Sequence, residues 1–119
     1  MARQALDFAG LEALIRALRG AGFRTVGTTV ESGAIVYGEI TSAADLPRGY
    51  VDRQTPGGYR LSHTDGARLF DYVVGPQSLK TLFHKSRLTL WEVTQSNGQL
   101  NFHAALPPDD KVAIIGVRP

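Results

Sequence analysis

The hydrophobic pattern begins with one segment at helical spacing. Its apolar stripe consists of Phe8, Leu11, Leu14, Ile15 and Leu18. A stripe of this kind predicts an amphipathic helix that buries one face. Asp7 stands where an N-cap is expected, and Gly20 and Gly22 stand where the helix should end.

Shorter apolar and β-branched runs follow the predicted helix and favour strands. Strands are expected at residues 23–30, 34–40, 59–62, 69–74, 88–94, 100–106 and 112–117. A turn at residues 31–33 and the dipeptide Asn97-Gly98 each predict an antiparallel hairpin. The last run is continuously apolar, which predicts a strand buried on both faces.

Between these runs the pattern is interrupted. Residues 41–58 contain repeated prolines and glycines, which predict a long ordered loop with at most a short helical turn. Gly75-Pro76 should end one strand and lead into a short helix that reaches about residue 85. The expected fold class is therefore α+β, with a mainly antiparallel sheet, an N-terminal helix and a short helix after Gly75-Pro76.

Composition narrows the possible functions. The 119 residues fit a single domain, and that length is sufficient for a real core. The net charge of +2 is small and the charges are interspersed, so nucleic-acid binding is not expected. The chain has no cysteine, which excludes disulfides, thiolate metal sites and iron–sulfur ligation within these residues. No run is long enough for a membrane span and no targeting signal is evident, so we expect a cytoplasmic location without membrane insertion.

The turn from Gly75 to Lys80 carries the main candidate chemistry. Pro76 suits a helix start, and Ser78 and Lys80 would add a hydroxyl and a positive charge where backbone N–H groups lack partners. Such a turn could bind an anion or a partner's carboxylate. The simpler alternatives are that Ser78 caps the helix and that Lys80 is a solvated side chain.

Other candidates are weaker. Ser78 with His84 or His103 could form a hydrolase site, but no nucleophile-elbow motif surrounds the serine. The three histidines are too dispersed in sequence to predict a metal site. Four aromatic residues either line a ligand pocket or simply pack within the fold. They are Phe70, Tyr72, Phe83 and Trp91.

Several motifs together resemble a known family. They are LFDYVVGPQSLK at 69–80, DLPRG at 45–49, GYRL at 58–61 and KVAIIGVRP at 111–119. In order and spacing they resemble the 4Fe-4S dicluster β subunits of cytoplasmic NiFe hydrogenases (sulfhydrogenases), a family that also has a relative in anaerobic sulfite reductase. The resemblance covers most of the chain.

The resemblance implies an accessory role in electron transfer. Such subunits carry [4Fe-4S] clusters in a cysteine-containing half, which follows a region like residues 111–119. We therefore expect residues 1–119 to form the N-terminal accessory domain, with no cofactor of its own. The implied partners are the cluster-binding half of the same subunit, a flavin-binding subunit, and the hydrogenase or reductase subunit of the complex. The alternatives are a stand-alone small-molecule or anion-binding domain that uses the Gly75–Lys80 turn and, last, a hydrolase.

Overall fold

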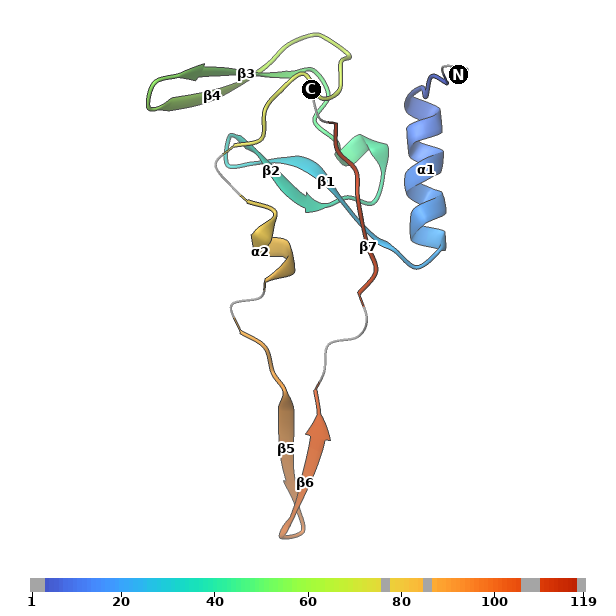
Figure 1. Ribbon diagram of the computed structural model, residues 1–119, viewed down its shortest axis with the longest axis vertical. Coiled ribbons are helices and arrows are strands. Elements are labelled where there is room, and N and C mark those ends of the chain that lie inside the picture. Colours follow the sequence, from blue (N-terminus) through green and yellow to red (C-terminus); the bar gives the residue numbers. More distant parts are fainter. Residues whose placement is uncertain (1–3, 76–77, 85–86, 106–109, 118–119) are drawn as a thin grey trace.

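The computed structural model describes residues 4–75, 78–84, 87–105 and 110–117. Figure 1 shows an N-terminal helix beside a small sheet, with two further hairpins projecting from this centre. The elements are α1 (Phe8–Gly20), β1 (Arg24–Glu31), β2 (Ala34–Glu39), η1 (Ala43–Asp45), β3 (Tyr50–Thr55), β4 (Gly58–His63), α2 (Lys80–Phe83), β5 (Trp91–Ser96), β6 (Gln99–Ala104) and β7 (Val112–Ile114). The α+β class with mainly antiparallel pairing is confirmed.

Helix α1 follows its sequence signals. The Asp7 carboxylate accepts a hydrogen bond from the Gly10 amide at 2.7 Å, as an N-cap should. The helix ends at Gly20, and Gly22 adopts a φ of +86° just beyond it. The predicted helix is therefore confirmed at both ends.

The central sheet has the strand order β2-β1-β7. Strands β1 and β2 pair antiparallel around a two-residue turn, in which Ser32 and Gly33 have φ of +50° and +75°. Positive φ at both turn positions matches the right-handed twist of the strands. Strand β7 returns from far along the chain and pairs with β1 in parallel.

The core lies between α1, η1 and one face of the central sheet. Its main cluster contains Ile15, Ile40, Ala43 and Leu46, and partly buried residues such as Leu11 pack against it. The helix is also tied to η1 because the Glu12 carboxylate accepts a hydrogen bond from the Ala43 amide at 2.7 Å. These residues hold the central sheet against the helix.

Strand β3 lies within the stretch that the sequence predicted to be a loop, so that prediction is wrong. Its sequence, YVDRQT, pairs with β4 across the turn at Pro56-Gly57. The β3–β4 ribbon projects from the core and most of its side chains are exposed. A ribbon without a buried face needs no apolar alternation, which explains why the pattern did not reveal it.

The predicted strand at residues 69–74 is also absent. Phe70 adopts a φ of +63°, which interrupts an extended conformation, and Leu69 makes only an isolated bridge with Arg48. Side chains hold this segment instead of a ladder of backbone hydrogen bonds. The Tyr72 and Thr28 hydroxyls lie 2.6 Å apart, and the Asp52 carboxylate accepts a hydrogen bond from the Val73 amide at 2.8 Å.

Strand β7 is shorter and more exposed than the sequence predicted. It spans only Val112–Ile114 at an edge of the sheet, and 49% of Ile114 is exposed. The prediction of a strand buried on both faces is therefore wrong. Val112 and Ala113 are partly buried, whereas Ile114 is exposed at the open edge of the sheet.

Replacement of Ile114 by alanine should consequently have a small effect. Since half of the side chain already contacts water, we expect a loss of about 1 kcal/mol in the free energy of unfolding, at the low end for aliphatic truncations. Denaturant melts of the two proteins would measure it. A loss above about 3 kcal/mol would mean that Ile114 is enclosed.

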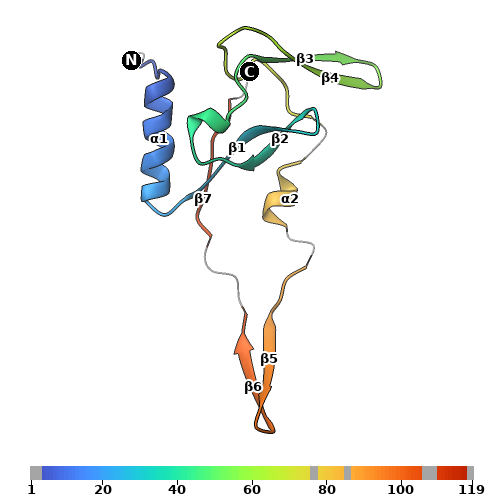
Figure 2. The same cartoon turned by 180° about the vertical axis from the view of Figure 1, so that it is seen from behind.

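The chain as a whole is extended. Its radius of gyration is 19.6 Å and its accessible surface is 9343 Å². A compact monomer of this size would have a radius of about 13–14 Å and a surface of about 6,300 Å². Figures 1 and 2 show the cause, because β5 and β6 form an arm that stands well away from the central sheet.

Candidate interaction surface

The arm is a two-stranded hairpin formed by β5 and β6. Asn97 and Gly98 make its turn with φ of +51° and +79°, which confirms the hairpin predicted from this dipeptide. The strands are shifted from the predicted ranges, since β5 begins at Trp91 and β6 ends at Ala104. Residue 106, where the second strand was expected to end, lies outside the described residues.

The two faces of the arm differ sharply in chemistry. Side chains on one face alternate with those on the other, so directly paired residues share a face. One face is largely apolar and carries Trp91, Val93, Gln95, Leu100, Phe102 and Ala104. The opposite face is polar and carries Glu92, Thr94, Ser96, Gln99, Asn101 and His103.

The apolar face of the arm is uncovered. Exposure is 65% for Trp91, 51% for Val93, 58% for Leu100 and 65% for Phe102. Two-stranded hairpins are marginally stable alone, and a contiguous apolar patch of this kind marks an interaction site. This apolar face, defined by the six residues above, is the strongest candidate for a functional surface.

The strand edges of the arm lack the usual protection. Exposed edge strands are commonly guarded by lysine, proline or a bulge. Neither β5 nor β6 contains lysine or proline, their register is unbroken, and Glu92 is the only acidic residue in the two strands. The arm can therefore accept another polypeptide on its face or along an edge.

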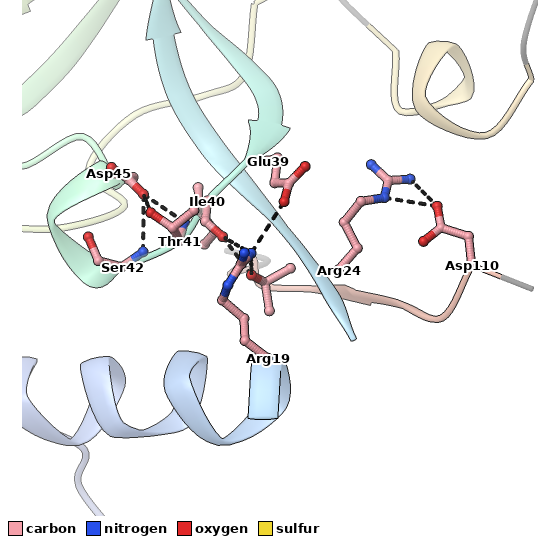
Figure 3. Close-up of polar contacts among 9 residues, drawn as sticks. Arg19, Arg24, Glu39, Ile40, Thr41, Ser42, Asp45 and Asp110 are labelled. Atoms are coloured by element: carbon pink, nitrogen blue, oxygen red, sulfur yellow. Dashed lines mark hydrogen bonds and ion pairs between the residues drawn. The ribbon is translucent and has the colours of Figure 1, made fainter. Parts of the chain in front are cut away.

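The base of the arm is anchored to the central sheet on the returning side. The Arg24 guanidinium contacts the Asp110 carboxylate at 2.8 and 2.9 Å, as Figure 3 shows. The Arg24 amide also donates to the Lys111 carbonyl at 2.7 Å. These contacts fix the start of β7 beside β1.

The Gly75–Lys80 turn is only partly described, because Pro76 lies outside the described residues. The Gly75 amide donates to the Ile35 carbonyl at 2.8 Å, and a Cβ at residue 75 would lie 3.2 Å from that oxygen. Glycine here thus allows the backbone to approach β2 closely. Ser78 lies outside α2, and its hydroxyl accepts a hydrogen bond from the Lys80 amide at 3.2 Å, while the Lys80 side chain is exposed.

Helix α2 is shorter than predicted. It is a single turn, Lys80–Phe83, which begins several residues after Gly75 and ends two residues before the predicted end. So short a helix has little dipole, which weakens the argument for an anion at its N-terminus. Ser78 makes no described hydrogen bond with a histidine, and no cluster of metal-ligating side chains occurs among the described residues.

The four aromatic residues do not form one pocket. Phe70 and Tyr72 lie together near the core with ring centres 6.4 Å apart, whereas Trp91 is on the exposed arm. Burial raises the pKa of the Tyr72 phenol and outweighs the hydrogen bond with Thr28, which by itself lowers that pKa. The sequence did hold a signal for the arm, since Trp91 and Val93 alternate with polar residues beside Asn97-Gly98.

A second polar cluster stabilises the turn around η1 (Figure 3). The Asp45 carboxylate accepts hydrogen bonds from the Thr41 amide at 2.7 Å, the Thr41 hydroxyl at 2.9 Å and the Ser42 amide at 3.1 Å. The Thr41 amide is the main cause that lowers the pKa of Asp45 below its ordinary value. Arg19 lies nearby and donates to the Ile40 carbonyl at 3.3 Å.

This cluster predicts a pH dependence of stability. A carboxyl with a lowered pKa contributes stability that is fully present above the pKa of the unfolded carboxyl, about 3.9, and is lost as the pH falls through the folded pKa. Asp45→Asn should therefore be less stable than the wild type at pH 7, and the difference should shrink below about pH 4. Urea melts at several pH values would measure this, with Asp65→Asn as control. A difference that stayed constant down to about pH 2 would contradict the assignment.

Comparisons with protein-family models, with curated proteins and with solved structures found no match to this chain. Among the described helices, none is long and apolar enough to cross a membrane.

Proposed function

We propose that this chain is an accessory interaction domain of an iron–sulfur electron-transfer subunit in a cytoplasmic hydrogenase or sulfur/sulfite reductase complex. Its arm packs on another part of that complex. The partner is either the cluster-binding half of the same subunit or a neighbouring hydrogenase, reductase or flavin-binding subunit. The [4Fe-4S] clusters belong to the cluster-binding half of the subunit.

Two separate observations support the proposal. The interaction role rests on the arm, whose uncovered apolar face is the observation that carries it. The electron-transfer setting rests on the four sequence motifs and their order. A face of this kind would be covered in an assembled complex, because leaving contiguous apolar surface in water costs about 25 cal/mol per Å².

In this proposal, the Gly75–Lys80 turn supplies a second contact with the partner. Helix α2 lies on the path from the central sheet to the arm (Figure 1), and the Lys80 ammonium is exposed there. A carboxylate of the partner can pair with Lys80 while the arm is docked. Gly75 keeps the turn close to β2, and Ser78 restrains the backbone at Lys80.

Site-specific photo-crosslinking in the native cells tests this function. A photoreactive residue at Val93 would report on the apolar face, and one at Thr94 would report on the polar face of the same strand. We expect Val93 to crosslink strongly to an iron–sulfur, hydrogenase, reductase or flavin-binding polypeptide, and Thr94 to crosslink weakly. Equal labelling from both faces, or a Val93 partner without a redox role, would refute the proposal.

A further inference from the structure

The β3–β4 ribbon carries two arginines at the same point on one face. Arg53 and Arg60 are directly paired across the antiparallel strands, so their side chains leave the ribbon on the same side. Like charges directly opposite one another destabilise a strand pair. Neither guanidinium forms an ion pair with a carboxylate among the described residues.

Hydroxyl groups surround this arginine pair. Thr55 and Ser62 lie two residues along their strands from Arg53 and Arg60, on the same face. The one acidic residue of the ribbon, Asp52, lies on the opposite face, where it accepts hydrogen bonds from the Val73 amide and the Gln54 amide group. Besides the apolar Val51 opposite Ser62, the arginine-bearing face offers positive charge and hydroxyls and no carboxylate.

The same face is hollowed. A cavity of about 500 Å³ is lined by Arg53, Thr55, Gly58, Tyr59, Arg60 and Ser62. Gly58 keeps it open at one end, since a Cβ there would lie 2.7 Å from the Thr55 hydroxyl oxygen. The volume falls within the range of small-molecule sites, about 300–1,000 Å³, and exceeds what a bare ion needs.

We propose that this hollow binds the phosphate group of a small phosphorylated molecule. Two guanidiniums can donate bidentate hydrogen bonds to a tetrahedral oxyanion, and the Thr55 and Ser62 hydroxyls can donate to its remaining oxygens. The bound dianion would also relieve the repulsion between Arg53 and Arg60. This site is separate from the arm and from the Gly75–Lys80 turn, so it stands independently of the proposed function.

Titration with inorganic phosphate and with pyrophosphate, followed by ¹H–¹⁵N NMR at constant ionic strength, tests the site. We expect saturable shifts confined to β3 and β4, and tighter binding of pyrophosphate. Arg53→Gln and Arg60→Gln should each weaken binding by about tenfold or more, because a charge-assisted pair is lost. Arg60→Lys keeps the positive charge but loses the two parallel N–H donors of the guanidinium. It should weaken binding by a smaller factor than Arg60→Gln does.

Arg16→Gln is the matched control, because Arg16 is an exposed arginine on α1 that pairs with Glu12. It should bind pyrophosphate as the wild type does. The spectrum of each variant shows directly that its fold is retained. Shifts that never saturate, that spread over α1, or that survive Arg53→Gln and Arg60→Gln would overturn the proposal. Tighter binding of a glutamate-rich peptide than of pyrophosphate would overturn the phosphate assignment.

Discussion

Gly49→Ala should lower the free energy of unfolding by more than about 3 kcal/mol, combining backbone strain with a steric clash. Gly49 has a φ of +76°, a conformation that strongly favours glycine. A Cβ at this position would lie 2.7 Å from the Thr64 carbonyl oxygen and closer still to that of Gly66. Backbone surrounds this Cβ position, so no flexible side chain can move aside.

The position matters because Gly49 joins two loops. Its amide donates to the Arg68 carbonyl at 2.8 Å, and its carbonyl accepts from the Thr64 amide at 2.7 Å and the Thr64 hydroxyl at 2.9 Å. Displacing Gly49 therefore breaks the junction between β3, β4 and the segment that leads to Phe70. Thermal and urea melts would measure the loss.

Gly57→Ala is the matched control for this change. Gly57 has nearly the same φ, +75°, but nothing lies within 4 Å of a Cβ placed there. Its cost should be about 1–2 kcal/mol, the conformational cost alone. Equal losses from Gly49→Ala and Gly57→Ala would show that the close approach at Gly49 does not contribute.

Trp91→Ala should weaken the proposed complex by at least about 2 kcal/mol, or roughly 30-fold in Kd. Trp91 combines a large apolar area with 65% exposure in the free chain, so burying it supplies much of the binding energy. The isolated chain should lose less than about 0.5 kcal/mol of stability, as exposed positions usually do. The affinity of the complex and the unfolding free energy of the chain must both be measured.

Asn101→Ala provides the control on the polar face of the same arm. Asn101 lies in β6 directly opposite Thr94, away from the apolar face. Its replacement should leave affinity within about threefold, since contacts outside a hot spot contribute little. If Asn101→Ala and Trp91→Ala weakened the complex equally, docking would not depend on the apolar face.

The elements with a strong local signal could be predicted from the sequence. The Asp7 cap and apolar stripe defined α1, and Asn97-Gly98 defined the arm's turn, because capping and hairpin chemistry act over a few residues. Strand β3 could not be found in this way. It is polar and lies in a ribbon whose pairing depends on β4, so no apolar period marks it.

Apolar runs gave wrong predictions of strands and of burial where tertiary contacts determine the conformation. Residues 69–74 have the pattern of a strand, yet Phe70 turns away at positive φ and Tyr72 is held by Thr28 from another element. Ile114 belongs to a continuous apolar run but lies half exposed at a sheet edge. Periodicity reports which residues prefer burial and cannot say which partner covers them.

The same reasoning applies to the candidate site. The sequence pointed to Gly75, Pro76, Ser78 and Lys80, and the described part of that turn is held by the Gly75 bond to β2 and by the Ser78 hydroxyl. The apolar face of the arm was visible as alternation in residues 91–95, but its exposure depends on the arm leaving the core. The distance of the arm from the core depends on the whole fold, so no local sequence motif predicts it.

The central claim is that the apolar face of the arm is uncovered in the isolated chain and covered by another part of the complex after assembly. Trp91 is the only tryptophan of the chain, so its fluorescence and acrylamide quenching report on that face directly. In the isolated chain we expect emission like that of tryptophan in water with efficient quenching. A shift to shorter wavelength with protection from acrylamide is expected in the assembled complex. Blue-shifted, protected emission in the isolated monomer, or water-like emission in the complex, would contradict the claim.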